Sequence, residues 1–221
     1  MGGGEVNGWI SPKYTLEEII KEREGIILKQ IANKDSNELG DTEVHLLLAE
    51  LQRGCVDQRN QGIIVTMGTD RMAELASLVE FSVRPLNKPV LFTGAMRTCE
   101  QQDFDGRENV QNAANLMREI TSEHLIEKAQ IYNPVGIVMG NQAVYGHSAV
   151  KVNTEKCTAF ECAWEYPLAT FESGKIKINR RKETEEKKVG FPELHLPKLR
   201  RTKVELVNFS YQPDVYELSS Y

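Results

Sequence analysis

Hydrophobic positions along this chain fall into two spacings, which predict two kinds of element. Short β-branched runs bounded by glycine are typical of strands buried on both faces of a sheet, and apolar residues three and four apart are typical of helices. Residues 62–66 have the first pattern and residues 71–83 have the second. The two patterns meet at Thr69-Asp70, so we expect a strand to run into a helix there.

The same spacings recur before and after this unit. They predict further helices over residues 14–21, 41–53 and 107–121 and further strands over residues 25–31, 89–93 and 135–139. Alternation of strands and helices implies right-handed crossovers and a parallel sheet covered by helices on both faces.

Beyond Gly140 the pattern changes from helical to alternating. Residues 144–152 and 168–178 alternate in the manner of hairpins, and Ser173-Gly174 suits the turn of the second. The fold class that we expect is therefore α/β, with a mostly parallel sheet, helices on both faces and a β-hairpin.

Composition divides the chain into three parts. We expect one α/β domain over residues 1–178, a charge-rich linker over 179–202, and the start of a second domain over 203–221, opening with a strand. The glycine-rich residues 1–8 predict a flexible segment or a tight loop. A chain of 221 residues is long enough to bury a full core.

Charge and hydropathy argue against two classes of partner. The formal net charge of −5 gives no support for nucleic-acid binding, which usually needs a basic face. No apolar run approaches the roughly 20 residues of a membrane helix, and the amino end carries no signal-peptide core. We therefore expect a cytoplasmic protein that binds neither nucleic acid nor membranes.

The cysteines show no spacing typical of a zinc or redox site; they are Cys55, Cys99, Cys157 and Cys162. We interpret Cys157 and Cys162 as small buried or half-buried thiols rather than as metal or redox ligands. The sequence thus predicts no metal site.

Candidate chemistry gathers after the strand at residues 62–66. Open α/β sheets bind ligands at the carboxyl ends of their strands, and Thr69-Asp70 places a hydroxyl beside a carboxylate there. Asp70 also stands near the expected N-cap of the next helix, where a carboxylate accepts backbone N–H bonds. Taken alone, the pair is either a ligand site or a strand–helix turn with an N-cap.

Three motifs follow one another at a characteristic spacing. They are Gly68-Thr69-Asp70, Gly94-Ala95-Met96-Arg97, and Asp105-Gly106 with Asn109. Together with residues 146–160 they resemble the bacterial-type L-asparaginase/glutaminase family, and the likeness covers about residues 10–210 in order. The resemblance implies that family's amino-terminal α/β domain.

The resemblance also implies amide hydrolysis in two steps, without a cofactor. A threonine attacks the side-chain amide of asparagine or glutamine, ammonia leaves, and water then hydrolyses the acyl-enzyme. Thr69, Asp70 and Lys151 match the family's threonine–aspartate–lysine group. The chemistry fits, because a hydroxyl needs a base and a lysine beside a carboxylate can assist it. The resemblance further implies a homo-oligomer.

Substrate-binding positions follow from the same resemblance. Ser36, Asn37 and Glu38 match the loop that holds the α-amino acid end of the substrate, with Gly68 and Asp70 beside it. Asp70 would face the substrate's ammonium in a charge-assisted contact. Without that context, Ser36 is simply a loop hydroxyl that bonds its own backbone.

The chain also departs from the family pattern. Gly4 stands where the family has its primary nucleophile threonine, Tyr14 matches the catalytic flexible-loop tyrosine on a shorter loop, and we expect the second domain to be missing. Three interpretations therefore stay open. The chain is an asparaginase-type amidohydrolase domain, a catalytically inactive relative that serves as a binding or assembly module, or a piece of a longer protein.

Overall fold

The computed structural model describes residues 3–6, 9–12, 27–83, 86–131, 134–164 and 166–180, the first two ranges as backbone alone. All of them fall within one compact unit, residues 1–190. Tyr14, the helix expected over 14–21 and most of the expected linker lie outside the described residues, as does the start of a second domain expected over 203–221.

The strands of the described residues are short, with three to five residues each. They are β1 (Gly3–Val6), β2 (Trp9–Pro12), β3 (Ile63–Thr66), β4 (Val90–Thr93), β5 (Val135–Met139), β6 (Gln142–Tyr145), β7 (Ala149–Lys151), β8 (Phe160–Cys162), β9 (Ala169–Glu172) and β10 (Lys175–Ile178). The α-helices are α2 (Asp41–Val56), α3 (Met72–Ser82) and α4 (Gly106–Ser122), and the short 3₁₀ helices are η1 (Ser36–Glu38) and η2 (Gly146–Ser148).

The main sheet of the described residues has six strands in the order β10-β9-β6-β5-β4-β3. Strands β3, β4 and β5 pair in parallel, and the β5–β6, β6–β9 and β9–β10 pairs are antiparallel. Four of the six strands, β3, β4, β5 and β9, therefore run in one direction. Ser173 and Gly174 both have positive φ (49° and 74°), as a tight β9–β10 turn requires, so the expected hairpin is confirmed.

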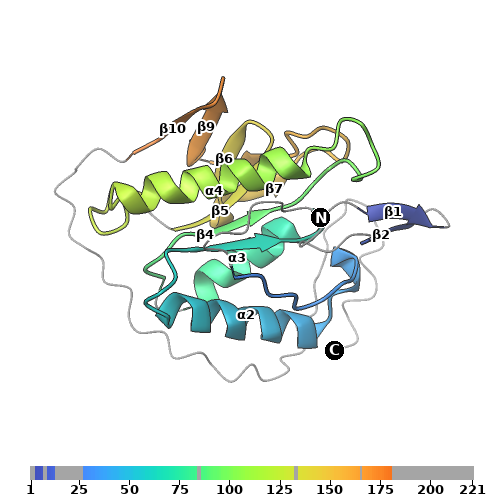
Figure 1. Ribbon diagram of the computed structural model, residues 1–221, viewed down its shortest axis with the longest axis horizontal. Coiled ribbons are helices and arrows are strands. Elements are labelled where there is room, and N and C mark those ends of the chain that lie inside the picture. The colour runs from blue at the N-terminus through green and yellow to red at the C-terminus, as the bar shows by residue number, and fades with distance from the viewer. Residues whose placement is uncertain are drawn as a thin grey trace, which may run out of the picture. The chain divides into compact units, whose positions relative to one another are not determined.

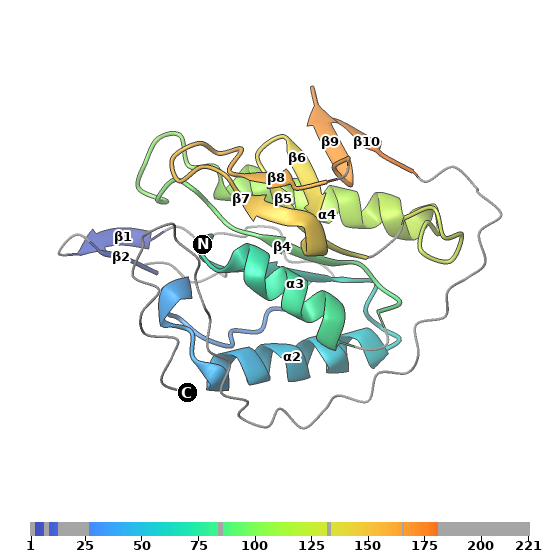
Figure 2. The same cartoon turned by 180° about the vertical axis from the view of Figure 1, so that it is seen from behind.

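Helices cover both faces of the sheet, as expected for the α/β class. Figure 1 shows α4 on the near face, and Figure 2 shows α3 and α2 on the opposite one. Alternate residues of β4 enter different cores: Phe92 packs with α2 and α3, and Leu91 packs with α4. This period of two, with apolar residues on both faces, explains why the strand reads as a continuous hydrophobic run.

The two crossovers between the parallel strands differ in hand. Strands β3, β4 and β5 are neighbours in chain order, so the connections through α3 and α4 step in the same direction across the sheet. Because α3 packs on one face and α4 on the other, the connections have opposite hands. The expectation of right-handed crossovers throughout is therefore wrong for one of them. Helix α3 contacts β5 on one face of the sheet, and α4 crosses from β4 to β5 on the opposite face.

The strand expected over residues 25–31 is wrong for its described part. Residues 27–31 form no strand, and Ile27 is 79% exposed. Lys29 of this segment pairs with Glu50 of α2. The described part of this segment is attached to α2 and does not pair with β3, which is the edge strand of the main sheet among the described residues.

Two further expectations are corrected. Residues 144–152 do not form a hairpin of their own, because β6 pairs with β5 and β9, whereas β7, after the η2 turn, pairs with β8 in a separate two-stranded sheet. Residues 1–8 are not merely a loop, because Gly3–Val6, which includes Gly4, pairs with Trp9–Pro12. The glycines here are compatible with extended backbone, which their composition alone does not reveal.

Candidate active site

The loop after β3 presents Thr69 and Asp70 at the carboxyl end of the parallel strands. Helix α3 begins at Met72, and its N-cap is Arg71. Asp70 therefore stands next to the N-cap, near it as expected, but its side chain does not cap the helix. Its carboxylate accepts hydrogen bonds from Lys151 and Asn37 instead, because a cation and a side-chain amide together bind it better than one helix terminus.

Lys151 joins the two residues of this loop through one ammonium group. Its Nζ donates to Thr69 Oγ1 at 2.9 Å and to Asp70 Oδ1 at 2.6 Å. The lysine side chain is 15% exposed, whereas that of Asp70 is 52% exposed. Residues about 80 positions apart in the chain thus form a compact hydroxyl–ammonium–carboxylate group whose acidic member is open to solvent.

The second oxygen of Asp70 is bound from η1. Asn37 Nδ2 donates to Asp70 Oδ2 at 2.8 Å. The hydrogen bond from Lys151 lowers the pKa of Asp70 most, partial burial opposes this, and the hydrogen bond from Asn37 lowers it further. The stabilisation from these contacts is therefore present above the ordinary pKa of an aspartate and is lost as the pH falls through the lowered value.

We expect Lys151→Met to raise the pKa of Asp70 toward its ordinary value, because the variant removes the main cause of the lowering. A pH titration of the Asp70 side-chain carbon by NMR measures this directly. Lys156→Met, which removes an exposed lysine from the loop after β7, is the matched control and should leave the titration unchanged. Equal titrations in wild type and Lys151→Met would contradict the contact.

The η1 turn brings the predicted substrate-binding residues to the same loop. Asp35 caps it, accepting a hydrogen bond from the backbone N–H of Asn37 at 2.8 Å. Ser36 is buried against Gly68, where an added Cβ would lie 2.9 Å from Ser36 Oγ. Glu38 is exposed, and its backbone N–H donates to Asp35 at 3.0 Å.

The structure therefore places Ser36, Asn37 and Gly68 next to Thr69 and Asp70. The absence of a side chain at Gly68 is what lets η1 approach the loop after β3 so closely.

A second glycine sets the loop after β3 against the loop after β4. A Cβ on Gly94 would lie 2.3 Å from the carbonyl oxygen of Met67, a distance that no side chain tolerates. The two loops are also joined by a backbone hydrogen bond, in which the Met67 N–H donates to the carbonyl oxygen of Thr93 at 3.0 Å. The loop after β4 thus supports the loop of Thr69 through close backbone contact at Gly94.

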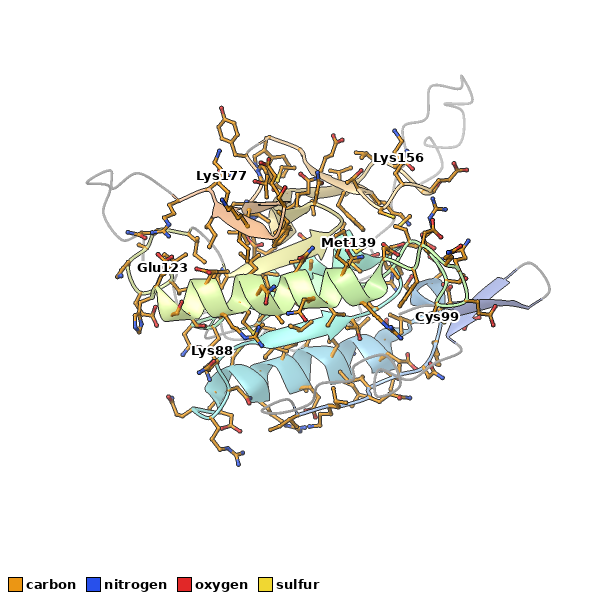
Figure 3. The ribbon with its side chains drawn as sticks, turned by 45° about the horizontal axis from the view of Figure 1, so that its top comes forward. Lys88, Cys99, Glu123, Met139, Lys156 and Lys177 are labelled. Atoms are coloured by element: carbon orange, nitrogen blue, oxygen red, sulfur yellow. The ribbon has the colours of Figure 1, made fainter. Side chains whose placement is uncertain are left out.

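Sequence reasoning missed the polar network that ties these loops to α4. Buried Asn109 donates from Nδ2 to the Gly94 carbonyl and to Asp105 Oδ2, both at 2.9 Å, and its Oδ1 accepts from the Gly140 N–H at 2.9 Å. The loops after β4 and β5 are therefore fixed by one side chain. Figure 3 labels Met139, the last residue of β5, whose sulfur lies 3.7 Å from the same amide.

Asp105 completes the network from the start of α4. Its carboxylate accepts from the backbone N–H groups of Met96 at 3.1 Å and Arg97 at 3.0 Å. The sequence signal was present, because Asp105 and Asn109 are four residues apart and share one side of a helix start. Without the fold, nothing indicated that this side faces two loops rather than solvent.

Among the residues that the structure describes, no three His, Cys, Asp or Glu side chains lie so as to hold a metal ion. Cys157 and Cys162 are half-buried, in line with their interpretation as thiols of that kind. In the described part of the chain, no helix has both the length and the apolar character needed to cross a bilayer.

Comparison with known proteins matches residues 2–184 to the family described as Asparaginase, N-terminal. L-asparaginase 2 of Escherichia coli (strain K12) is 29% identical over 152 residues, which are 69% of this chain and 40% of that protein. A subunit of the glutamyl-tRNA(Gln) amidotransferase of Saccharolobus islandicus (strain M.14.25 / Kamchatka #1) is 28% identical over 179 residues, covering 73% of this chain and 37% of that protein.

The likeness extends to the fold. The crystal structure of a probable cytoplasmic L-asparaginase from Campylobacter jejuni matches with a TM-score of 0.64 at 24% identity, over 76% of this chain and 52% of that one. This supports the fold alone. The chain spans about two fifths of the length of the curated relatives that it matches.

Proposed function

The chain belongs to the asparaginase family, and on this premise we propose that it hydrolyses the side-chain amide of asparagine or glutamine to the acid and ammonia. The observation that carries the proposal is the contact of Lys151 Nζ with both Thr69 Oγ1 and Asp70 Oδ1. One amine is thereby in reach of the hydroxyl that must lose a proton and of a carboxylate that balances its charge.

The reaction that we propose uses this group in two steps. Lys151 in its neutral form takes the proton of Thr69 while Oγ1 bonds to the amide carbon. The C–N bond then breaks, and the nitrogen leaves with that proton as ammonia. Water attacks the resulting ester, giving its proton back to the threonine oxygen as the acid departs. Atoms balance, with one water consumed for each ammonia released.

Substrate selection, in this proposal, rests on the exposed side of Asp70. Its carboxylate is ionised over the neutral range, as that of an ordinary aspartate is, and the lowered pKa keeps it ionised to a lower pH. Its side chain is half exposed, so it can meet the α-ammonium of a free amino acid. Asn37 orients the carboxylate from behind through Oδ2. The similar proteins support the amide class, since their names include an L-asparaginase and a glutamyl-tRNA(Gln) amidotransferase.

A second candidate is a binding or assembly module without turnover. The observation that favours it is Gly4, which has no hydroxyl at the position that the resemblance gives to the primary nucleophile. The two candidates share the binding residues and differ only in chemistry. The module predicts ligand binding without ammonia.

Ammonia release from L-asparagine and L-glutamine, measured with the purified chain, tests the proposal. N-acetyl-asparagine is the control substrate, because it keeps the amide and lacks the ammonium that Asp70 would bind. We expect release from one or both free amino acids and a kcat/KM at least about tenfold lower for the acetylated one, the worth of one charge-assisted contact. Calorimetric binding of the amino acids without any ammonia would favour the module.

A further inference from the structure

Lys151 does not sit on the main sheet, so its position needs a separate cause. It ends β7, a strand of three residues that pairs with β8 alone. A two-stranded sheet this short is marginal by itself and must be held by packing against its surroundings. The contacts at the start of β7 therefore decide where the ammonium at its end lies.

A buried carboxylate of α3 makes those contacts. Glu80 is 3% exposed. Its Oε1 lies 2.7 Å from Nδ1 of His147, and its Oε2 accepts a hydrogen bond from the backbone N–H of the same residue at 2.9 Å. One side chain thus binds both the ring and the backbone of η2, four residues before Lys151.

The turn is also seated closely on the helix. An added Cβ on Gly146 would lie 3.2 Å from Glu80 Oε2 and 3.2 Å from the Ala76 carbonyl, so η2 has little room to shift along α3. Aromatic rings surround the histidine, with centroid distances of 5.8 Å to Tyr145 and 6.1 Å to Trp164. The pair is shielded from water, where such contacts are strongest and most directional.

We propose that the Glu80–His147 pair is a positioning device, which fixes the start of β7 on α3 so that Lys151 at its end meets Thr69 and Asp70. Helix α3 begins just after Asp70 and carries Glu80 in its last turn, while the segment from η2 to β7 carries His147 near its start and Lys151 at its end. Two polar contacts therefore join the same two segments at opposite ends. The kinetic consequence of this device rests on the proposed function, but its structural consequence does not.

The test reads the Lys151–Asp70 contact without using activity. The titration of Asp70 is followed by NMR in wild type, Glu80→Gln and His147→Gln, with Lys151→Met as the reference for complete loss of contact. We expect both pair variants to raise the pKa of Asp70 part of the way toward the Lys151→Met value. Thermal unfolding verifies that each variant is folded, and the two different substitutions guard against failure of one of them.

A matched control breaks a different pair. Glu123→Gln removes the contact of Glu123 Oε2 with Arg180 Nη2, which lie 2.5 Å apart. Figure 3 shows Glu123 at one end of α4 and Cys99 near the other end. This control should leave the Asp70 titration unchanged. If a folded Glu80→Gln or His147→Gln variant titrates as wild type does while Lys151→Met does not, the positioning role is refuted.

Kinetics then separates this proposal from the proposed function. In an active protein, Glu80→Gln should lower kcat between about 10-fold and 100-fold, the cost of a small misplacement of a reacting group, with KM changed less than about threefold. An inactive wild-type chain would contradict the proposed function and leave the NMR result to decide the positioning role by itself.

Discussion

Lys151→Met is expected to lower kcat for amide hydrolysis by about 10³-fold. The side chain keeps nearly the same length and loses the only group that touches both the Thr69 hydroxyl and the Asp70 carboxylate among the described contacts. Loss of a positioned proton acceptor costs about 10²- to 10⁴-fold. Ammonia release under saturating asparagine or glutamine measures the change.

The control for this prediction is Lys156→Met, a change of the same chemistry at an exposed lysine, labelled in Figure 3. It should retain the wild-type rate. A Lys151→Met variant that releases ammonia within about tenfold of wild type would remove the lysine from the proposed mechanism, because such a residual rate exceeds what loss of general base catalysis allows.

Asn109→Ala is expected to lower the free energy of unfolding by about 3 kcal/mol, because it leaves several buried polar groups without their partner. These are the Gly94 carbonyl, one oxygen of Asp105 and the Gly140 N–H. Urea unfolding followed by circular dichroism measures the loss. Asn115→Ala, on the same helix, is the matched control.

Among the contacts described, Asn115 Oδ1 accepts hydrogen bonds from two neighbours on the same helix, Gln111 and Arg118. Its replacement should change the free energy of unfolding by less than about 0.5 kcal/mol, as is usual for surface positions. If both variants unfold at the same urea concentration, the Asn109 network contributes nothing beyond a surface amide, and the account of how the two loops are fixed is wrong.

Much of the fold could be predicted from periodicity alone. The strand at 135–139 is found with the bounds expected, and the helix at 41–53 differs only by three residues at its end. These elements carry their own signal, since apolar spacing along each one matches the core that it enters. The handedness of the crossovers cannot be predicted in this way. It depends on which face of the sheet α3 covers, and no single element's spacing records that.

The candidate site likewise has residues that the sequence predicts and residues that only the fold reveals. The local pattern predicts a site at Thr69-Asp70, because the pair follows a strand end. Lys151 lies 81 positions from Asp70, and only the resemblance to the family predicts that it belongs to the same site. The Glu80–His147 pair spans 67 residues and carries no local pattern, since a glutamate within an amphipathic helix is usually on its solvent face. Buried polar contacts between distant segments arise from the fold and leave no periodic trace in the sequence.

In the proposed reaction the Thr69 hydroxyl attacks the amide, although Gly4 has no hydroxyl. Ammonia release by Thr69→Ala and Thr69→Ser, beside wild type and with folding verified for each, tests it most directly. We expect wild type to turn over, Thr69→Ala to fall to background, and Thr69→Ser to keep measurable activity because its hydroxyl remains in reach of Lys151. Equal release by Thr69→Ala and wild type would contradict this expectation, as would a folded wild-type chain that releases no ammonia.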